Sequence, residues 1–527
     1  MTESQNIYDF RAEIKKLLDI LSKSLYKHKE IFIRELISNS VDALKKIQFI
    51  LLTDRDVEAP DAELKIEIFF NSEENTLTIR DTGVGMAKEE LINDLGTIAG
   101  SGTEKFITQL QEMKKEGKKE VDLDIIGQFG IGFYSVFMVA DKVKVITKSY
   151  KKDEPSYQWE SDGSGKFTIE PADKKLRGTD VVLYLTDEEK EFLNQYRIET
   201  IIKKYSNFVS FPIYVSKLEK GQVPLPEEEK AKEEKEEKEK KEEEIKKEGE
   251  EEEVEQEEIE EEKKPVNETE PLWRKKDQDI TEEQYKNFYN YIAQRYDDYL
   301  HVINYQVEGT SIRFRSLMYI PESSSRDLFL PDTDYGLSLY SRNVMIMKYC
   351  KELIPNWMRF VKGVLESDDI SLNISRETIQ SNVKILKMKD LLAKKFIREL
   401  TSVKDDDSEK YRKFWDEFGD FVKEGIISDQ IRQKKLQNLL LFSTSKTKND
   451  ELIGLKDYLD RIKEDQEEIY YLVGESLDLL RMSPHLGYYE KNDIEVILFD
   501  KDIDNFLMMH MNDYTVTEGE GDDKEVK

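Results

Sequence analysis

A single acidic stretch divides this sequence into two blocks and limits how the whole chain can fold. The 38 residues of Glu227–Lys264 include 22 Glu and 10 Lys and no aromatic residue. So few apolar side chains cannot bury enough surface to offset the entropy lost on ordering. Glu–Lys pairs four residues apart would allow part of it to form a solvated helix. We favour a charged flexible linker over residues 217–270, and an acidic docking site for a basic partner is the weaker alternative.

The composition excludes several classes of function. A formal net charge of −31 argues against broad binding to nucleic acid or to an anionic membrane. One cysteine, Cys350, and four scattered histidines leave no disulfide framework, no cysteine-based zinc site and no HExxH motif. The sequence has no apolar run near the length of a transmembrane helix, and its start does not resemble a signal peptide. We therefore predict a cytoplasmic protein.

The block before the linker, residues 1–216, begins with helical patterns and continues with strand-like runs. The helical patterns cover Ile7–Lys27 and His28–Leu52. The strand-like runs are Leu64–Phe70, Leu77–Arg80, Lys142–Thr147, Phe167–Glu170 and Asp180–Leu185. This partial segregation predicts an α+β fold, a two-layer sandwich with helices over one face of a mostly antiparallel sheet.

The block after the linker predicts α/β layers in two parts, residues 271–400 and 401–527. Strands are expected at Ile312–Ile320 and Val344–Lys348, long helices from Asp390 onward, and a short β-like piece at Ile494–Phe499.

A first candidate site lies on the helix His28–Leu52. Glu35, Asn39 and Asp42 are spaced by four and three residues, which places them on one helix face. Mg²⁺ takes oxygen ligands and few of them from protein, which suits Asn39. A carboxylate one turn earlier, Glu35, can accept a proton from an attacking water. Spacing alone predicts a solvated helix face equally well.

A second candidate is the strand end Asp81, followed by Thr82, Gly83, Val84, Gly85 and Met86. The glycines allow a sharp turn and close approach of a ligand, and a carboxylate that only accepts hydrogen bonds matches the exocyclic amine of adenine. An ordinary Asx-type turn is the alternative.

A third candidate is the glycine cluster Gly127, Gly130 and Gly132, which precedes the apolar stretch Phe133–Ala140. Glycines before a helix expose backbone N–H groups that can bind phosphates. A second cluster, Gly96–Gly102, lies upstream, and the polar segment between the two clusters is typical of a lid. We found no Walker motif.

The order of these motifs, completed by Gly178-Thr179, resembles the Bergerat-type ATP-binding fold of gyrase-like, histidine-kinase, MutL and heat-shock protein 90 ATPases. Longer runs narrow the resemblance to the heat-shock protein 90 chaperones, including the HtpG type. They are Tyr26–Phe32, Arg34–Ser40, Leu95–Thr103, Gly127–Ser135, Pro271–Trp273, Tyr319–Pro321, Glu352–Pro355 and Leu372–Gln380. The long linker is more typical of eukaryotic-type members.

This resemblance implies roles for individual residues. Glu35 matches the general base, Asn39 the ligand of Mg²⁺ and Asp81 the adenine-reading carboxylate. Other positions implied for the ATP pocket are Asp42, Gly85, Met86, Asp94, Gly127, Gly130, Gly132, Phe133 and Thr179. Arg376 matches an arginine that reaches the γ-phosphate, and Asn373 and Gln380 lie in the same loop. Because Arg376 and Glu35 lie on opposite sides of the linker, ATP hydrolysis would be slow and conformationally gated.

Three departures from the family pattern bear on these roles. Gly100 stands where many relatives have a nucleotide-contacting lysine, and Asp94 stands where some have asparagine. Full-length relatives are homodimers that dimerise through a C-terminal domain. We identify no candidate for that domain in the sequence up to Lys527.

The resemblance predicts an ATP-dependent chaperone that drives folding or activation of unfolded or metastable clients in the stress response, together with co-chaperones. Phe329 and Leu330 match an amphipathic loop and are candidate client contacts. A non-hydrolysing ATP-binding scaffold is one alternative. A DNA-transducing gyrase- or MutL-like ATPase is another, and a pI near 4.8 argues against it.

Overall fold

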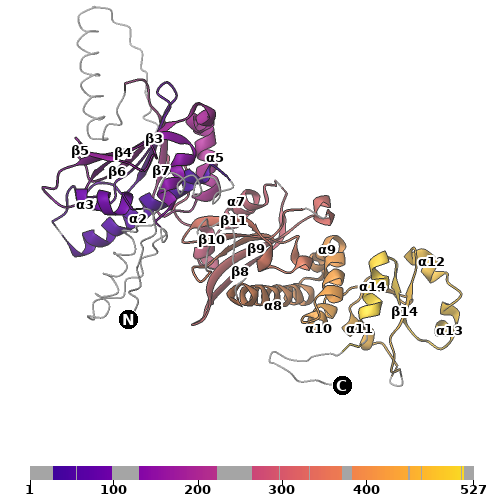
Figure 1. Ribbon diagram of the computed structural model, residues 1–527. Helices are drawn as coiled ribbons and strands as arrows, with labels where there is room; N and C mark the ends of the chain where they lie inside the picture. The colour runs from indigo at the N-terminus through magenta and orange to yellow at the C-terminus, as the bar shows by residue number, and fades with distance from the viewer. Residues whose placement is uncertain are drawn as a thin grey trace, which may run out of the picture. The chain divides into compact units, whose positions relative to one another are not determined.

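The structure is a computed structural model that describes residues 28–54, 56–97, 130–221, 264–295, 297–330, 333–370, 383–448, 451–463, 466–511 and 513–514. The chain divides into two compact units (Figure 1). Unit 1 consists mainly of residues up to Pro271, and unit 2 mainly of residues from Leu272 onward.

Unit 1 contains a seven-stranded sheet in the order β5-β4-β3-β6-β2-β1-β7. Its strands are β1 (Ile66–Asn71), β2 (Thr76–Asp81), β3 (Ala140–Lys148), β4 (Tyr157–Ser161), β5 (Thr168–Pro171), β6 (Gly178–Leu185) and β7 (Ile213–Lys217). All neighbours are antiparallel except β1 and β7, which are parallel. The predicted α+β class with a mostly antiparallel sheet is confirmed, whereas β4 and β7 were not foreseen.

Helices cover this sheet. They are α2 (Ile31–Thr53), α3 (Lys88–Glu90) and α5 (Gln195–Tyr205), with the 3-10 helices Gly132–Met138 and Asp187–Leu193 and a π-helical turn at Leu91–Leu95. The helix predicted at His28–Leu52 is confirmed as α2, which packs on β1, β2 and α5. Its apolar residues Ile33, Leu36, Ile37, Val41 and Leu44 are buried. The helix expected over Phe133–Ala140 is instead a 3-10 helix ending at Met138, and Ala140 already begins β3.

The chain returns to unit 1 just after the acidic stretch. The N–H of Val266 donates to the carbonyl of Ile213 in β7 at 2.9 Å. Asn267 is buried, and its side chain accepts from the Ile213 N–H at 2.8 Å. The same side chain donates to the carbonyls of Val209 and Phe211, both at 3.1 Å. Residues 266 and 267 are therefore held to unit 1 by specific hydrogen bonds.

Unit 2 contains a five-stranded sheet in the order β11-β10-β12-β9-β8. Its strands are β8 (Tyr299–Glu308), β9 (Arg313–Pro321), β10 (Leu337–Ser341), β11 (Val344–Cys350) and β12 (Lys362–Glu366). Helices α7 (Glu282–Ala293), α8 (Val383–Asp406) and α9 (Ser408–Ser428) accompany it (Figure 1). Short 3-10 helices occur at Leu272–Arg274, Asp277–Asp279, Arg326–Phe329, Lys351–Leu353 and Asn356–Met358.

The last part of unit 2 is a small three-stranded sheet, β13-β15-β14. Its strands are β13 (Ser443–Thr444), β14 (Tyr470–Val473) and β15 (Val496–Phe499). The surrounding helices are α10 (Gln433–Gln437), α11 (Leu455–Leu459), α12 (Leu477–Arg481), α13 (Leu486–Lys491) and α14 (Asp502–His510). Leu480, Leu486, Val496 and Leu498 form its buried apolar cluster. In the described ranges of both units, we find no helix with the length and apolar character needed to cross a bilayer.

Candidate nucleotide site

The face of α2 predicted to carry chemistry combines buried and exposed side chains. Glu35 and Asp42 are 5% and 3% exposed, whereas Asn39 is exposed. The guanidinium of Arg34, itself buried, donates to Glu35 Oε1 from Nη2 at 2.6 Å and from Nε at 3.1 Å. Because Arg34 also lies over the ring of Tyr205 in α5, this ion pair has a fixed position. The Glu35 carboxylate is therefore oriented through one oxygen.

The start of the 3-10 helix Gly132–Met138 lies directly against Glu35. A Cβ atom placed on Gly132 would be 2.4 Å from Glu35 Oε2, so only glycine leaves room for the carboxylate here. Gly130 has a φ of +63°, which glycine adopts without strain. Phe133 is buried, with its ring centroid 5.8 Å from that of Trp159. This part of the glycine cluster is thus close to the α2 face.

Three strands place side chains at one level across the sheet. Asp81, the last residue of β2, is opposite Thr179 in β6, and Thr179 is opposite Thr147 in β3. The hydroxyls of Thr147 and Thr179 are 3.0 Å apart. The N–H of Met86 donates to Thr147 Oγ1 at 2.9 Å. Asp81, Thr179 and Met86, which the sequence singled out separately, are therefore brought together.

The turn after Asp81 is compact and depends on its glycines. The N–H of Gly83 donates to Asp81 Oδ1 at 2.8 Å, and a Cβ on Gly83 would lie 2.6 Å from that of Ala43 in α2. Gly85 has a φ of +60°, and a Cβ there would lie 1.8 Å from the carbonyl oxygen of Lys148. The turn thus packs against both α2 and β3, which joins the first and second candidate motifs into one site.

Arg177, the residue directly before β6, holds the same turn and was missed by the sequence analysis. Its guanidinium is buried and donates from Nη1 to the carbonyls of Thr82 and Gly83. Its position directly before the Gly178-Thr179 motif was the one signal that could have identified it. Thr147 was also missed, because only strand pairing reveals that it lies beside Thr179.

Asp81 is electrostatically unusual. Burial raises the pKa of its carboxyl to about 7, partly opposed by the backbone N–H of Gly83 and by the charge of Lys174, while Asp180 raises it further. Within the part of the chain that the structure describes, no Lys or Arg side chain forms an ion pair with Asp81. A buried carboxylate supplied with few donors can accept a hydrogen bond from a ligand.

Asp94 lies near the face of α2 that carries Asp42, since the carboxylates of both residues interact with Lys46. Burial lowers the pKa of Lys46, while the nearby carboxylates of Asp42, Asp94 and Glu90 oppose that effect. Asp94 itself is half-buried in the π-helical turn Leu91–Leu95. Asp94 is therefore part of a charged group that includes a lysine.

The structure does not test every residue that the sequence predicts. Gly127, Asn373, Arg376 and Gln380 lie outside the described residues, as does Gly100. Phe329 and Leu330 belong to unit 2, where each is 61% exposed, and the ring centroid of Phe329 lies 5.2 Å from that of Phe421.

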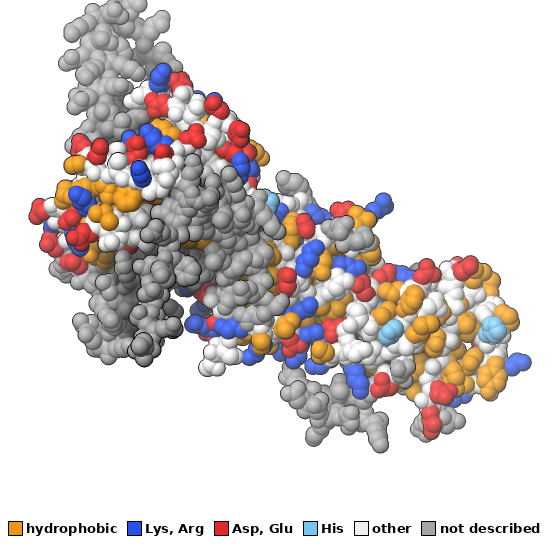
Figure 2. Space-filling model, viewed as in Figure 1, with side chains coloured by type: hydrophobic (Ala, Val, Ile, Leu, Met, Phe, Trp, Pro, Cys, Tyr) orange, Lys and Arg blue, Asp and Glu red, His pale blue; other side chains and the backbone are white. Residues whose placement is uncertain are grey.

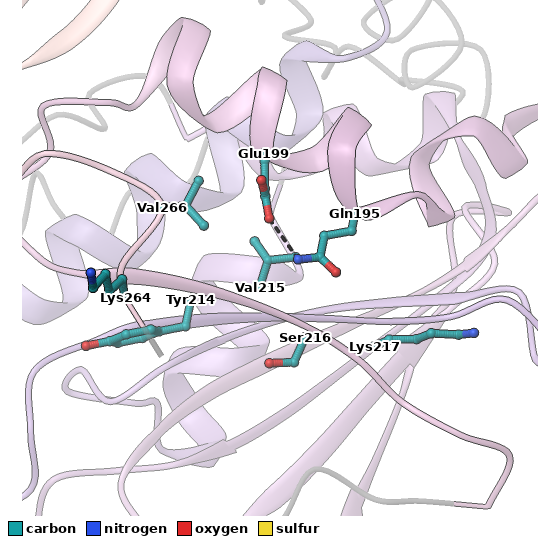
Figure 3. A pocket seen from close by; sticks show the side chains of 8 residues that line it. All are labelled: Gln195, Glu199, Tyr214, Val215, Ser216, Lys217, Lys264 and Val266. Atoms are coloured by element: carbon teal, nitrogen blue, oxygen red, sulfur yellow. Dashed lines mark hydrogen bonds between the residues drawn. The ribbon is translucent and has the colours of Figure 1, made fainter. Parts of the chain in front are cut away.

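A pocket of about 370 Å³ lies elsewhere in unit 1, between α5 and β7 (Figure 3). Its lining is Gln195, Glu199, Tyr214, Val215, Ser216, Lys217, Lys264 and Val266, and it includes none of the predicted nucleotide residues. The described residues also contain no group of three or more metal-ligating His, Cys, Asp or Glu side chains.

Comparisons with known proteins identify the family. A model described as Hsp90 protein matches residues 191–520, which is more than half of the chain. The chain belongs to the Hsp90 family. A second model, described as histidine kinase-, DNA gyrase B- and HSP90-like ATPase, matches residues 26–172 of this Hsp90 chain. That range includes Glu35, Asp81 and Met86 of the site and ends before Thr179.

Bacterial relatives agree with this assignment of the chain to the Hsp90 family. It is 39% identical to a protein named chaperone protein HtpG from Wolinella succinogenes, over 96% of this chain and 75% of the relative. Proteins of the same name from Helicobacter pylori and Geobacter metallireducens are 40% and 38% identical, over 98% and 96% of this chain and 77% and 74% of theirs. The expectation of a eukaryotic-type member stays a prediction.

The predicted resemblance and function are confirmed at this level. This Hsp90-family chain carries an ATPase domain of the Bergerat type and is an ATP-dependent chaperone. The DNA-transducing alternative is compatible only with the second family model, because that model describes the whole superfamily of related ATPases. Figure 2 shows acidic and basic side chains interspersed over the visible described surface of unit 1.

Proposed function

We propose that unit 1 binds ATP with Asp81 accepting a hydrogen bond from the adenine amine. The observation that carries this proposal is the buried carboxylate of Asp81, opposite Thr179 and held by the Gly83 N–H at 2.8 Å. Burial raises the pKa of its carboxyl to about 7 and so disfavours the ionised form, which a further hydrogen-bond donor such as an amine would stabilise. Thr179 and Met86 then line the same end of the pocket, and Gly85 gives the turn its close packing.

We propose that Mg²⁺ accompanies the nucleotide and that Asn39 is its protein ligand. Asn39 is exposed on α2, one turn from Glu35, and offers an amide oxygen. Mg²⁺ binds oxygen and usually keeps several waters and phosphate oxygens, so one or two protein ligands suffice. When bound, the ion would neutralise phosphate charge. Asp42 and Asp94 beside Lys46 would adjust the charge near the phosphates.

We propose that Glu35 is the general base for hydrolysis. Arg34 donates to Oε1, and Oε2 lies beside Gly132 at the start of the 3-10 helix. A water near that oxygen could transfer its proton to Glu35 while attacking the γ-phosphate. The backbone of Gly127, Gly130 and Gly132 would bind phosphates, and Phe133 would complete the pocket wall.

We propose that Arg376, which follows the linker in the sequence, takes part in ATP hydrolysis, with Asn373 and Gln380 in the same loop. This role comes from the resemblance of Leu372–Gln380 to the family, since these residues lie outside the described ones. An arginine neutralises the charge that develops on the transferred phosphoryl group. A catalytic residue so far along the chain from Glu35 would make turnover slow and dependent on a conformational step.

We propose the following division of labour along the chain. Residues 1–216 form the ATP-binding domain, and residues 271–400 and 401–527 form two parts of a middle domain. The charged linker lies within residues 217–270, although Lys217 belongs to β7 and residues 266 and 267 are hydrogen-bonded to unit 1. The exposed Phe329 and Leu330 would contact unfolded or metastable clients in the cytoplasm. Co-chaperones would also bind this chain. We propose that its full-length relatives are homodimers.

Two variants test the nucleotide assignments. Asp81→Asn should abolish ATP binding, because an amide in place of the carboxylate loses the charged acceptor. Glu35→Ala should keep ATP binding and lower the rate of phosphate release by about 10²–10⁴, the usual contribution of a general base. Titration calorimetry and phosphate release would be measured on both.

Asp187→Asn is the matched control, because Asp187 is exposed and pairs with Lys190, which is not among the proposed pocket residues. Normal turnover in Glu35→Ala would eliminate the proposed base. ATP binding by the wild-type chain without phosphate release at high protein concentration would favour a non-hydrolysing scaffold instead.

A further inference from the structure

Arg177 is a buried cation that has no carboxylate partner among the residues that the structure describes. Its side chain is 1% exposed. The guanidinium donates only to backbone carbonyls there: from Nη1 to Thr82 and to Gly83, the latter at 3.3 Å, and from Nη2 to Ala62 at 3.4 Å. Its Nε is buried and has no hydrogen-bond partner in the same described part of the chain. Carbonyl groups replace only part of the solvation that a guanidinium loses on burial.

The neighbouring buried charges are arranged differently. Asp180 of β6 is 6% exposed, and both of its oxygens accept from Arg80, each at 2.9 Å. Lys174 also donates to Asp180 Oδ1, at 2.6 Å. Asp180 is therefore fully paired, whereas neither Arg177 nor Asp81 has an ion-pair partner within the described residues.

One peptide group links Arg177 to Asp81. The carbonyl oxygen of Thr82 accepts a hydrogen bond from Arg177 Nη1. The N–H of the same peptide group, which belongs to Gly83, donates to Asp81 Oδ1 at 2.8 Å. A cation on the carbonyl side polarises the peptide group and makes its N–H a stronger donor. The guanidinium of Arg177 therefore strengthens the hydrogen bond that the Asp81 carboxylate accepts.

The two charges also act on each other through space. Burial lowers the pKa of Arg177, and the negative charge of Asp81 opposes that effect. Because such a coupling is reciprocal, the charged guanidinium must favour the ionised form of Asp81 by the same free energy. The charge of Lys174 likewise lowers the pKa of Asp81, and the charge of Asp180 raises it.

The other elements around the turn contribute charges that are engaged elsewhere. The turn packs against the segment before β1, against α2 and against β3. The charged side chains of these elements lie beside partners of opposite sign: Lys65 beside Glu63 at 3.5 Å, Lys148 beside Glu58 at 3.0 Å, and Lys46 beside Asp42 and Asp94. Within the described residues, we therefore expect Arg177, Lys174 and Asp180 to determine the charge of Asp81.

We propose that Arg177 is a positioning residue for ATP binding, which keeps the Asp81 carboxylate ionised and in place through the peptide group between Thr82 and Gly83. Arg177 acts through Asp81 and is not itself a contact of the nucleotide. This inference rests on the adenine-binding role proposed for Asp81 above. It explains how a buried carboxylate can accept a hydrogen bond from an amine instead of taking up a proton near neutral pH.

Arg177→Met tests this link, because it keeps much of the side-chain volume and removes the charge and all donors. Loss of a nearby opposite charge should raise the pKa of Asp81 by about one unit from its value of about 7. The dissociation constant for ATP, measured by calorimetry, should then be about tenfold higher than in wild type at pH 6. At pH 9 the carboxyl is ionised in both chains, so the two constants should agree within about twofold.

Arg177→Lys is the milder variant and keeps the test valid should Arg177→Met fail to fold. It retains the charge but has no second arm to reach two carbonyls, so its ATP affinity at pH 6 should lie between those of wild type and Arg177→Met. At pH 9 its affinity should also equal that of wild type. For either variant, a loss of affinity of the same size at pH 6 and pH 9 would indicate a purely structural role and overturn the proposal.

Arg197→Met is the matched control for the loss of an arginine from unit 1. Arg197 of α5 pairs with Glu30 at 2.8 Å and with Glu191 at 3.0 Å, and neither partner belongs to the turn after Asp81. Its ATP affinity should equal that of wild type at both pH values. A rise of the dissociation constant at pH 6 as large as in Arg177→Met would contradict a specific link to Asp81.

Asp81→Asn separates this inference from the function on which it rests. If Asp81→Asn bound ATP as well as wild type, the adenine-binding role of Asp81 would fail, and the role of Arg177 with it. If Asp81→Asn lost ATP binding while Arg177→Met kept the affinity and the pH profile of wild type, only the role of Arg177 would be overturned. Loss of binding in Asp81→Asn together with a defect of Arg177→Met that disappears at pH 9 would support both.

Discussion

Two strands, β2 in unit 1 and β12 in unit 2, end in the same way but for different purposes. Asp81 and Glu366 are the last residues of these strands, and they are 5% and 4% exposed. Each is followed by a buried hydroxyl residue, Thr82 or Ser367, that donates to one backbone carbonyl and accepts from one backbone N–H. The two strand ends differ in what the carboxylate binds.

Glu366 receives three hydrogen bonds from Trp273 and Arg274, so its own chain supplies its donors. Asp81 receives hydrogen bonds from backbone N–H groups, and burial raises its pKa to about 7. A carboxylate saturated by its own chain fixes structure, whereas one short of donors favours an incoming donor. The comparison teaches that the state of a buried carboxylate, rather than its burial, separates a ligand site from a structural one.

The sharpest test of this comparison is whether substitution of each carboxylate raises or lowers the free energy of unfolding. The pKa of Asp81 lies at about 7 in the folded chain, above the ordinary 3.8. Between these values the folded chain binds more protons than the unfolded chain, so stability falls as pH rises from about 4 to about 7. Asp81→Asn removes this loss. The free energy of unfolding of the variant, relative to that of the wild type, should therefore increase by up to roughly 4 kcal/mol as the pH rises from 4 to 8.

Glu366→Gln should have the opposite effect, because it leaves the buried side of Arg274 without its charged partner. A loss of about 3 kcal/mol is expected at pH 8. Urea unfolding of ligand-free protein at both pH values would measure these free energies. Destabilisation of similar size by both variants at pH 8 would show that the two carboxylates do not differ.

The second test disturbs the backbone beside Asp81 without changing its carboxylate. Gly178 has a φ of +114°, and a Cβ there would lie 2.1 Å from the carbonyl oxygen of Asp81. Gly178→Ala should therefore destabilise the chain by about 3 kcal/mol and weaken ATP binding. Gly221→Ala is the control, since Gly221 also has a positive φ of +77° but no neighbour within 4 Å. It should cost about 1 kcal/mol and leave ATP affinity unchanged, as measured by thermal unfolding and calorimetry.

The third test asks whether Asp81 must ionise to bind ATP. Below its pKa of about 7 the carboxyl holds a proton that binding would have to release. The dissociation constant for ATP should then rise about tenfold per pH unit below 7 and level off above it. Calorimetry in buffers of different ionisation enthalpy would detect the released proton. Arg376→Ala serves as a reference that should retain the same pH profile, and a flat profile in the wild-type chain would contradict the proposed role.

The fold and the site could be predicted where the signal lies in residues that are close together in the sequence. The helix α2, the strands β1, β2, β3, β5 and β6, and the Asp81 turn could be read from periodicity and glycine spacing. The partners that define the site could not, because Thr147 and Arg177 become neighbours of Asp81 only through strand pairing and packing. Likewise no spacing rule joins Trp273 to Glu366, which are 93 residues apart.

The smallest expected effect tests the feature that the two strand ends share. Thr82 donates to the carbonyl of Glu63 at 2.6 Å and accepts from the N–H of Lys65 at 3.1 Å. Ser367 makes the equivalent pair of bonds to Arg313 and Asp369. Thr82→Val and Ser367→Ala should therefore each cost about 1–2 kcal/mol in urea unfolding, because each leaves a carbonyl and an N–H without a partner.

Their effects on function should separate even though their effects on stability agree. Thr82→Val loosens the turn that holds Asp81 and should weaken ATP binding a few-fold, with kcat at saturation unchanged. Ser367→Ala should leave ATP affinity unchanged, because the nucleotide residues proposed above belong to unit 1. If Ser367→Ala weakened ATP binding as much as Thr82→Val, the two strand ends would not separate a ligand site from a structural one. That division follows from the donors each carboxylate already has, and the hydroxyl variants examine it without touching either carboxylate.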